Sequence, residues 1–304
     1  MKKIKSGLET NVLFREAIMN NSDIHKLTDS ETKEIQKCLL NTMKDIDSSC
    51  RKRNMTYFLC GGSALGAVRH QGYIPWDDDI DLTMPRKDYD KLSAVLEEDY
   101  PDKYWIQDVR TDEKYDLNSM KIRVKGTICQ ELLDPDPEKA GVFIDIYALE
   151  DTYSSKAHRV LHGIVGEGLL LICSCVRIES KKEVIKKLTG NDKVLDVVRK
   201  KLLLAKLFSF KPLRQWLLLT EAYLGKVNNP KSEYVSIPTG RKHYFGEMYT
   251  RASFFPPKEM RFAGNHFYVM NQPGEYLSKL YGDSYMDAPK EMQREKHAVV
   301  RFHL

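Results

Sequence analysis

The feature that most constrains this chain is a run of four aspartates within five positions, 77–81. Like charges this close together are unfavourable unless a cation neutralises them. The flanks on both sides are apolar or aromatic, so the run is expected at the edge of a folded core. On a strand, Asp79 and Asp81 lie on one face, and Ile80 and Leu82 lie on the other. Such a pair of carboxylates predicts a hard-cation site for Mg²⁺, with Mn²⁺ as the alternative. A charged surface turn is the competing interpretation, but it gives no reason for acids to alternate with aliphatic residues.

A glycine turn precedes the aspartates. Residues 55–60 are expected to form a short buried strand, and residues 64–69 the first turns of a helix. Between them lie Gly61, Gly62 and Ser63, with Ser63 expected to cap the helix. Backbone N–H groups at such a turn can approach a phosphate, and a helix N-terminus favours negative charge. A phosphate site near a Mg²⁺ site predicts phosphoryl or nucleotidyl transfer.

Three segments resemble a known family. Residues 61–81 read GGSALGAVRHQGYIPWDDDID, residues 141–147 read GVFIDIY, and residues 281–286 read YGDSYM, followed by Pro289 and His297. They resemble the signatures of the LicD family, which comprises bacterial phosphocholine transferases and relatives of fukutin and fukutin-related protein. The resemblance spans about residues 30–300 and is loose over 151–240. It implies a nucleotidyltransferase-like fold and transfer of a phospho-alcohol from a CDP-linked donor to a glycan hydroxyl.

The acidic residues carry the predicted chemistry. Asp79 and Asp81 are expected to hold the metal, and Asp145 to join them from a neighbouring core strand, where an unpaired buried carboxylate would be costly. Asp77 resembles a metal or base position of the family. The predicted catalytic and metal-binding residues are therefore Asp77, Asp79, Asp81 and Asp145. Asp78 is expected to point away from them.

The predicted substrate-binding residues surround the same site. Gly61, Gly62 and Ser63 are expected to touch the donor phosphates. Three cations could neutralise the donor's charge: Arg69, Lys121 and Arg123. Each can equally be a structural cation, and Lys121 or Arg123 can instead form a salt bridge with Asp145. His297 matches a family position, although a lone histidine is more often structural.

Composition indicates a globular protein and a reducing compartment. The 304 residues are 42% hydrophobic and 30% charged, with a formal net charge of +5. The N-terminus lacks the apolar stretch of a secretory signal, and the six cysteines contain no Cys-x-x-Cys pair. We expect a cytoplasmic protein, with contact at the inner face of the membrane left open, and no nucleic-acid partner.

The chain divides into four predicted segments. These are an N-terminal extension at 1–26, an α/β (α+β) catalytic core at 27–150, a helical insertion at 151–226, and a C-terminal segment at 227–304 that closes the cleft. Within the core, capping residues at 28–31 predict a helix to about residue 53, and a second helix begins near Arg86. Short strands are expected at 104–108, 119–124 and 142–147. They predict a small mixed sheet with helices on one side.

The helical insertion has an unusual composition. Residues 160–178 are largely apolar but are expected to be too interrupted to cross a membrane. Residues 181–214 contain eleven Lys or Arg against three acids, interleaved with leucines and followed by Trp216. Such a stretch can lie on an anionic membrane surface, or it can be an ordinary helical subdomain with a basic face.

Several functions remain open. The first is Mg²⁺-dependent transfer of phosphocholine from CDP-choline to a cell-surface glycan of the teichoic acid or lipopolysaccharide type, or to its lipid-linked precursor. The alternatives are transfer from CDP-ribitol or CDP-glycerol, nucleotidyl transfer to a small acceptor, and a catalytically silent glycan-binding protein. The intact glycine turn and acidic run argue against a silent protein.

Overall fold

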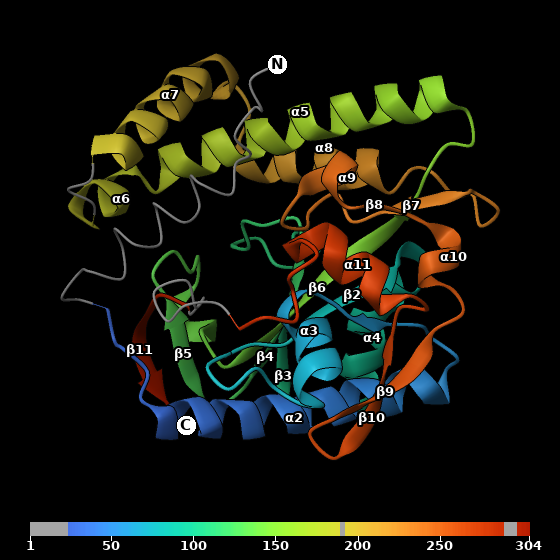
Figure 1. The fold of residues 1–304 in the computed structure, drawn as a ribbon. Helices are drawn as coiled ribbons and strands as arrows, with labels where there is room; N and C mark the ends of the chain where they lie inside the picture. The colour runs from blue at the N-terminus through green and yellow to red at the C-terminus, as the bar shows by residue number, and fades with distance from the viewer. Residues whose placement is uncertain (1–23, 189–191, 289–296) are drawn as a thin grey trace.

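A computed structural model describes residues 24–188, 192–288 and 297–304 of the chain. Its centre is a seven-stranded mixed sheet with a main path of β1-β2-β6-β4-β3 (Figure 1). Strands β2 and β6 are parallel, and the other neighbours on this path are antiparallel. The predicted mixed α/β architecture is therefore confirmed. The strands of the sheet are β1 (Phe58–Leu59), β2 (Asp81–Pro85), β3 (Tyr104–Gln107), β4 (Met120–Val124), β6 (Phe143–Asp151), β7 (Tyr234–Ser236) and β8 (Met248–Thr250).

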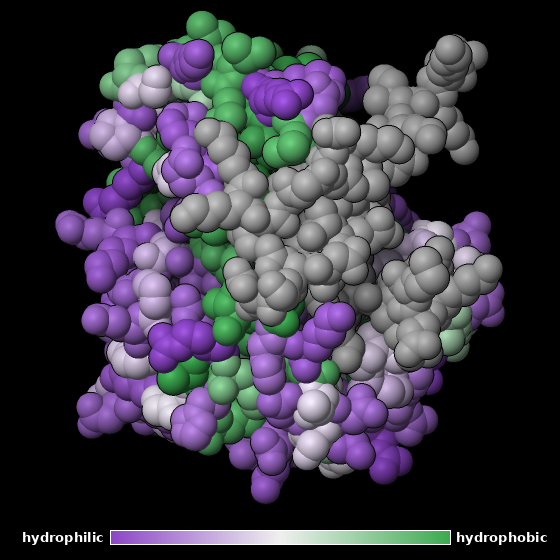
Figure 2. All heavy atoms as spheres, turned by 90° about the vertical axis from the view of Figure 1, so that its left-hand side faces the viewer, coloured by the Kyte–Doolittle hydropathy of each residue, from purple (hydrophilic) through white to green (hydrophobic). Residues whose placement is uncertain are grey.

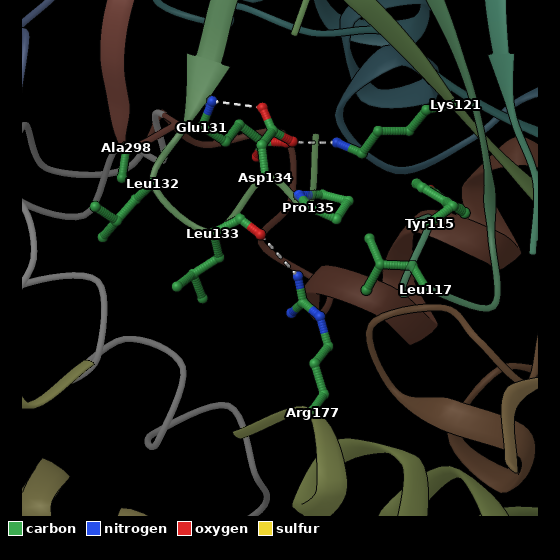
Figure 3. Close-up of a pocket in the computed structure, with 10 residues that line it drawn as sticks. All are labelled: Tyr115, Leu117, Lys121, Glu131, Leu132, Leu133, Asp134, Pro135, Arg177 and Ala298. Atoms are coloured by element: carbon green, nitrogen blue, oxygen red, sulfur yellow. Dashed lines mark hydrogen bonds and ion pairs between the residues drawn. The ribbon is translucent and has the colours of Figure 1, made fainter. Parts of the chain in front are cut away.

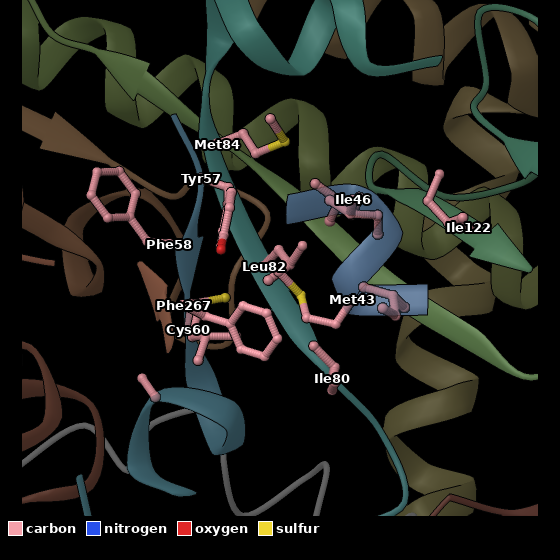
Figure 4. Packing of buried hydrophobic residues seen from close by; sticks show 14 of the residues in the cluster. Met43, Ile46, Tyr57, Phe58, Cys60, Ile80, Leu82, Met84, Ile122 and Phe267 are labelled. Atoms are coloured by element: carbon pink, nitrogen blue, oxygen red, sulfur yellow. The ribbon is translucent and has the colours of Figure 1, made fainter. Parts of the chain in front are cut away.

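Two helices of the core follow their sequence signals. Helix α2 (Asp29–Lys52) begins at the predicted capping box, in which the Thr28 hydroxyl and the Glu31 carboxylate bond each other's backbone N–H groups. Its buried residues recur at helical spacing and pack on the apolar face of the sheet. Figure 4 shows Met43 and Ile46 of α2 beside Leu82 of β2. Helix α4 (Arg86–Asp99) starts directly after β2, as predicted.

The first strand is shorter than expected. Strand pairing covers only Phe58–Leu59 of the predicted segment 55–60, because β1 pairs with β2 through just two residues. The chain then turns at once into helix α3 (Gly61–His70), which packs against β2 and against β9 (Lys258–Phe262). Strand β9 forms a hairpin with β10 (Asn265–Val269). Helix α11 (Pro273–Tyr281), the predicted last helix, packs on α3.

A second small sheet joins distant parts of the chain. Strand β5 (Ile128–Glu131), which the sequence reading missed, pairs with β11 (Val299–His303). The short helices η1 (Pro137–Lys139), α9 (His243–Gly246) and α10 (Arg251–Phe254) lie in connections. The pairing of β5 with β11 brings the C-terminal residues beside the catalytic core.

The region after β6 is helical, as the sequence predicts. Helix α5 packs on α7 and α8, and together they form a layer along the upper side of the molecule in Figure 1. The expectation that residues 160–178 are too interrupted to cross a membrane is not supported. Helix α5 is long and apolar enough by composition, with a window of mean hydropathy 1.6. The predicted segment boundaries stay predictions. The layer comprises α5 (Lys156–Ser180), α6 (Lys182–Leu188), α7 (Asp192–Phe208) and α8 (Leu213–Leu224).

Candidate active site

The register of three strands builds a charged row across the sheet. Asp81 of β2 pairs with Asp145 of β6, and Asp145 pairs on its other side with Lys121 of β4. Residues in register on neighbouring strands point to the same face, so these three side chains lie side by side. Lys121 Nζ lies 3.3 Å from the Asp145 carboxylate. The salt bridge that competed with a metal role for Asp145 is thus formed by Lys121.

The other aspartates precede the strand. β2 begins at Asp81, so the prediction that Asp79 lies on a regular strand is wrong, although the Ile80 carbonyl still accepts a hydrogen bond from the Asp145 N–H (3.1 Å). The Asp77 carbonyl is fixed by Gln36 of α2 (2.8 Å). These contacts hold the acidic segment between α2 and β6.

The carboxylates of the cluster lie close enough to raise one another's pKa values. Burial raises the pKa of Asp79 to about 6, with Asp78 and Asp145 adding to the rise and His297 opposing it. Burial, followed by the charges of Asp79 and Asp145, raises the pKa of Asp81 well above its usual value. The proximity of these carboxylates is the electrostatic condition that a bound cation relieves.

The glycine turn fits against the carboxylates. Gly61 has a φ of +52°, and a Cβ there would lie 2.7 Å from Asp81 Oδ2. A Cβ on Gly62 would lie 2.7 Å from Asp77 Oδ2. The Gly61 N–H donates to the Tyr276 hydroxyl (2.8 Å). The two glycines therefore bring the start of α3 into direct contact with the acidic cluster.

Ser63 has a different position from the one predicted. The N-cap of α3 is Cys60, and Ser63 lies inside the first turn, so the prediction that Ser63 caps the helix is wrong. Its hydroxyl accepts a hydrogen bond from the Asp81 N–H (2.9 Å). Ser63 thereby links the helix to the first residue of β2, and contact with donor phosphates stays a prediction for Gly61, Gly62 and Ser63.

Asp78, which the sequence predicts to point away from the other aspartates, contacts the C-terminal segment. It is buried, and its carboxylate accepts hydrogen bonds from the backbone N–H of His297 (3.2 Å) and pairs with Nδ1 (3.0 Å). The other ring nitrogen lies 3.6 Å from Asp79. Burial alone would lower the pKa of His297, but Asp78, Asp79 and Glu131 raise it well above its usual value. His297 is therefore a cation that holds the acidic segment from the C-terminal side.

The two cations of β4 both approach Glu131 and the Phe143 ring but differ in their other partners. Lys121 donates to Glu131 (2.6 Å) as well as facing Asp145, whereas Arg123 is fully buried and bonds Gln107 and Asp134. The structure brings Lys121 to the acidic cluster and engages Arg123 in the core, so a phosphate contact for Arg123 stays a prediction. Glu131 was not among the predicted site residues. Residues 128–131 do not alternate between apolar and polar, so no local pattern pointed to Glu131.

Arg69 lies at the end of α3. Its guanidinium donates to the carbonyls of Tyr285 (2.9 Å) and Asp287 (3.2 Å). Burial lowers the pKa of Arg69, with Tyr281 and Asp77 opposing the change. Arg69 thus ties the segment after α11 to the helix that carries the glycine turn.

A pocket of about 230 Å³ opens beside the charged row (Figure 3). Lys121, Glu131 and Asp134 form one wall, and Arg177 of α5 reaches toward it from the helical layer, donating to the Leu133 carbonyl (3.4 Å). The remaining lining is mostly apolar and includes Leu117. The pocket is large enough for a small chemical group next to Lys121.

The donor chemistry of the site suits a hard cation. Asp77, Asp79, Asp81 and Asp145 offer only carboxylate oxygens, the ligands that Mg²⁺ prefers. A bound divalent cation would also offset the burial and the mutual repulsion that raise the pKa values of Asp79 and Asp81. Within the described ranges, however, no group of three or more His, Cys, Asp or Glu side chains is already arranged around a metal position. Binding of a cation would therefore require the carboxylates to reorient.

Comparisons with known proteins define the class. Residues 54–157 match the family described as LicD/FKTN/FKRP, nucleotidyltransferase domain. The lipopolysaccharide cholinephosphotransferase LicD of Haemophilus influenzae is 26% identical over 287 residues, which cover 88% of this chain and 96% of that protein. The predicted resemblance to the LicD family is thereby confirmed, and with it a transferase of the LicD type.

Two further relatives share only part of their length. An uncharacterised protein of Rickettsia typhi is 34% identical over 83 residues, or 27% of this chain and 26% of that protein. Another, from Rickettsia prowazekii, is 43% identical over 58 residues, or 19% of this chain and 22% of that protein. These shorter matches carry no information on the reaction.

Proposed function

We propose that this protein transfers phosphocholine from CDP-choline to a hydroxyl of a lipopolysaccharide-type glycan or of its lipid-linked precursor. The observation that carries the proposal is the register that pairs Asp81 with Asp145 and Asp145 with Lys121, beside a glycine turn. A row of two carboxylates and an ammonium suits a reaction in which the negative charge of phosphates must be neutralised. The head group and acceptor follow the printed name of the Haemophilus relative.

Each part of the site has a proposed task. Asp77, Asp79, Asp81 and Asp145 would hold Mg²⁺, which neutralises charge on the donor phosphates when it is bound. Lys121 supplies a further positive charge near Asp145, and Glu131 fixes its ammonium in place. Removal of the proton from the acceptor hydroxyl falls to one of the aspartates.

Substrate binding would use the surroundings of the row. Gly61 and Gly62 lie at the start of α3, where backbone N–H groups favour phosphate. The pocket next to Lys121 offers room for the small head group of the donor. Its apolar lining suits the methyl groups of choline, whereas Glu131 and Asp134 are already paired with Lys121 and Arg123. A lipid-linked acceptor would be met at the inner face of the membrane, so we propose a cytoplasmic protein with peripheral contact there.

Product mass tests this function directly. Purified protein would be incubated with Mg²⁺, a glycan acceptor and, in separate reactions, CDP-choline, CDP-ribitol, CDP-glycerol or a nucleoside triphosphate. We expect a phosphocholine adduct from CDP-choline only. A phospho-polyol adduct would replace the head group in the proposal, and a nucleotide adduct would replace the reaction.

Thermal shift separates binding from turnover. A ligand that binds only the native state raises the melting temperature by mass action. CDP-choline with Mg²⁺ is expected to raise it more than either component alone. No shift with any nucleotide and no product would support a catalytically silent glycan-binding protein.

A further inference from the structure

The helical layer exposes apolar side chains that the rest of the protein hides. Among the described residues, fourteen large hydrophobic side chains are exposed, and eleven of them lie between positions 160 and 219. Figure 2 shows hydrophobic spheres gathered at the end of the molecule where Figure 1 places α6 and α7. Exposed apolar side chains gathered in this way mark an interaction site.

On helix α5 the exposed residues form one stripe. Val160, Leu161, Ile164 and Val165 follow the spacing of a single helix face. The opposite face, which includes His162, is buried against α8 and α9. The exposed stripe is therefore a separate surface of a helix that is already packed on its other side.

Helix α7 repeats this arrangement with added positive charge. Leu203 and Leu207 are 65% and 67% exposed, and Phe210 just beyond the helix is 75% exposed. Arg199 and Lys206 lie exposed on the same helix and form no ion pair with a described residue. Apolar side chains flanked by cations favour a partner that is both apolar and anionic.

Three described acids of the layer pair with cations other than Arg199 and Lys206. Glu179 pairs with Lys182, Asp196 with Lys200, and Glu221 is buried against Arg86 of the core. The cations of residues 181–214 outnumber the acids eleven to three. A second copy of the same basic surface would be repelled, whereas a surface of anionic lipids would be attracted.

We propose that the exposed face of α5 and α7, with Phe210, lies on the surface of an anionic lipid bilayer. Leu203, Leu207 and Phe210 enter the acyl boundary, and Arg199 and Lys206 face the lipid phosphates. Trp216, which the sequence associated with this surface, takes no part. It is buried, and its Nε1–H donates to the Phe208 carbonyl (3.0 Å).

The helices are proposed to lie on the bilayer and not to cross it. Although α5 is apolar enough to span, its packed face carries His162, which bonds the Tyr223 carbonyl of α8 (2.9 Å). Removing α5 from this packing would break a buried contact. A surface orientation keeps the packing and covers only the exposed stripe.

Vesicle flotation tests the proposal without donor or acceptor, so its failure is distinguishable from failure of the proposed transferase activity. The full chain would be mixed with phosphatidylcholine vesicles, with or without phosphatidylglycerol, at low and high salt. We expect at least tenfold more binding to the anionic vesicles, and loss of most of it at high salt. Equal, negligible binding to both vesicle types would overturn the proposal.

Matched variants locate the surface. Leu203→Gln/Leu207→Gln/Phe210→Ser should lower binding at least tenfold, and Arg199→Gln/Lys206→Gln should lower it on anionic vesicles only. Met286→Gln/Leu304→Gln removes exposed apolar residues elsewhere and should leave binding unchanged. All changes are at exposed positions, and an unchanged melting temperature would verify folding. If the first variant bound like this control, or if it only abolished self-association in sedimentation velocity, the face would not be a lipid-binding surface.

Discussion

Soluble proteins usually bury apolar residues and expose charged ones. The catalytic core and the helical layer each depart from this distribution, in opposite ways. The core partly buries a cluster of carboxylates, whereas the layer exposes a series of leucines. Each arrangement is unfavourable in water by itself, the first because charge loses hydration and the second because apolar surface remains wet. The difference fits the two proposals, in which the core binds a cation and a phosphate and the helical layer binds a lipid surface.

The two regions also differ in how their charges are compensated. In the core, Lys121 and His297 contact the acidic cluster, and each also lies within ion-pair distance of Glu131. In the layer, cations outnumber acids. The two regions therefore lead to separate predictions.

The largest effect should come from Asp81→Asn. This change removes a carboxylate that the charged row needs, so turnover should fall at least about a hundredfold. Because like-charge repulsion is also removed, the folded state should be at least as stable as the wild type. Initial rates with CDP-choline and thermal melts measure both quantities.

The exposed Asp102→Asn is the matched control, since Asp102 lies in a turn away from the row. It should keep full activity. Retention of near-wild-type turnover by Asp81→Asn at ordinary Mg²⁺ would remove the acidic row from catalysis.

A smaller loss is expected for Gly62→Ala. The new Cβ would lie 2.7 Å from Asp77 Oδ2, which is the end of a side chain and can move aside. The protein should therefore fold, but with the Asp77 carboxylate displaced and turnover lowered roughly tenfold. Calorimetric titration with Mn²⁺ should show weaker binding, a readout independent of turnover.

Gly66→Ala provides the contrast within the same helix. Its Cβ would lie 2.4 Å from the Gly72 carbonyl, which is backbone and cannot rotate away. This variant should lose stability, whereas Gly62→Ala should lose function. Unchanged metal affinity and turnover in Gly62→Ala would contradict the role assigned to Asp77.

The sequence predicted the local parts of the site, and it offered a salt bridge from Lys121 or Arg123 to Asp145 without deciding between them. Alternation placed Asp145 on a core strand, and the capping box located α2 to within one residue at its start. The pairing of Asp145 with Lys121 depends on β4 running antiparallel to β6, which no local pattern reports. The contact between Asp78 and His297 joins residues 219 positions apart, so it too required the fold.

Local sequence patterns also gave wrong predictions where one pattern is compatible with several structures. Ser63 follows two glycines and is a good cap by composition, yet the helix starts at Gly61, because the glycines can enter the first turn beside the carboxylates. Trp216 lies in a basic, leucine-rich segment and is nevertheless buried. An amphipathic surface helix and a packed helix have similar composition, and only the packing tells them apart.

A third prediction concerns a carboxylate of the core outside the acidic row. Glu247 is buried, and burial raises its pKa to about 7, with the Lys242 N–H opposing the rise. An unfolded glutamate ionises near pH 4.5, so the folded state loses stability as the pH rises from 4.5 through 7. Glu247→Gln should therefore be more stable than the wild type by roughly 1–3 kcal/mol at pH 8 and little different at pH 4.5.

Urea unfolding at the two pH values measures this difference. The exposed Glu113→Gln is the control and should show no such pH-dependent gain. An equal effect of Glu247→Gln at both pH values would mean that its contacts, and not its charge, determine stability.

The smallest expected effect belongs to the helical layer and compares two glycines with open surroundings. A Cβ on Gly168 of α5, or on Gly126 between β4 and β5, would meet no atom within 4 Å. Gly126 has a φ of +82°, whereas Gly168 lies within a helix. Gly168→Ala should stabilise the protein by about 1 kcal/mol, since alanine favours the helix, and Gly126→Ala should destabilise it by about as much through backbone strain.

Urea unfolding gives both values, and neither change should alter turnover, because neither residue contacts the charged row. If Gly168→Ala lowered stability, the helical state of α5 in solution would be wrong, and the exposed stripe built on its spacing would lose its basis.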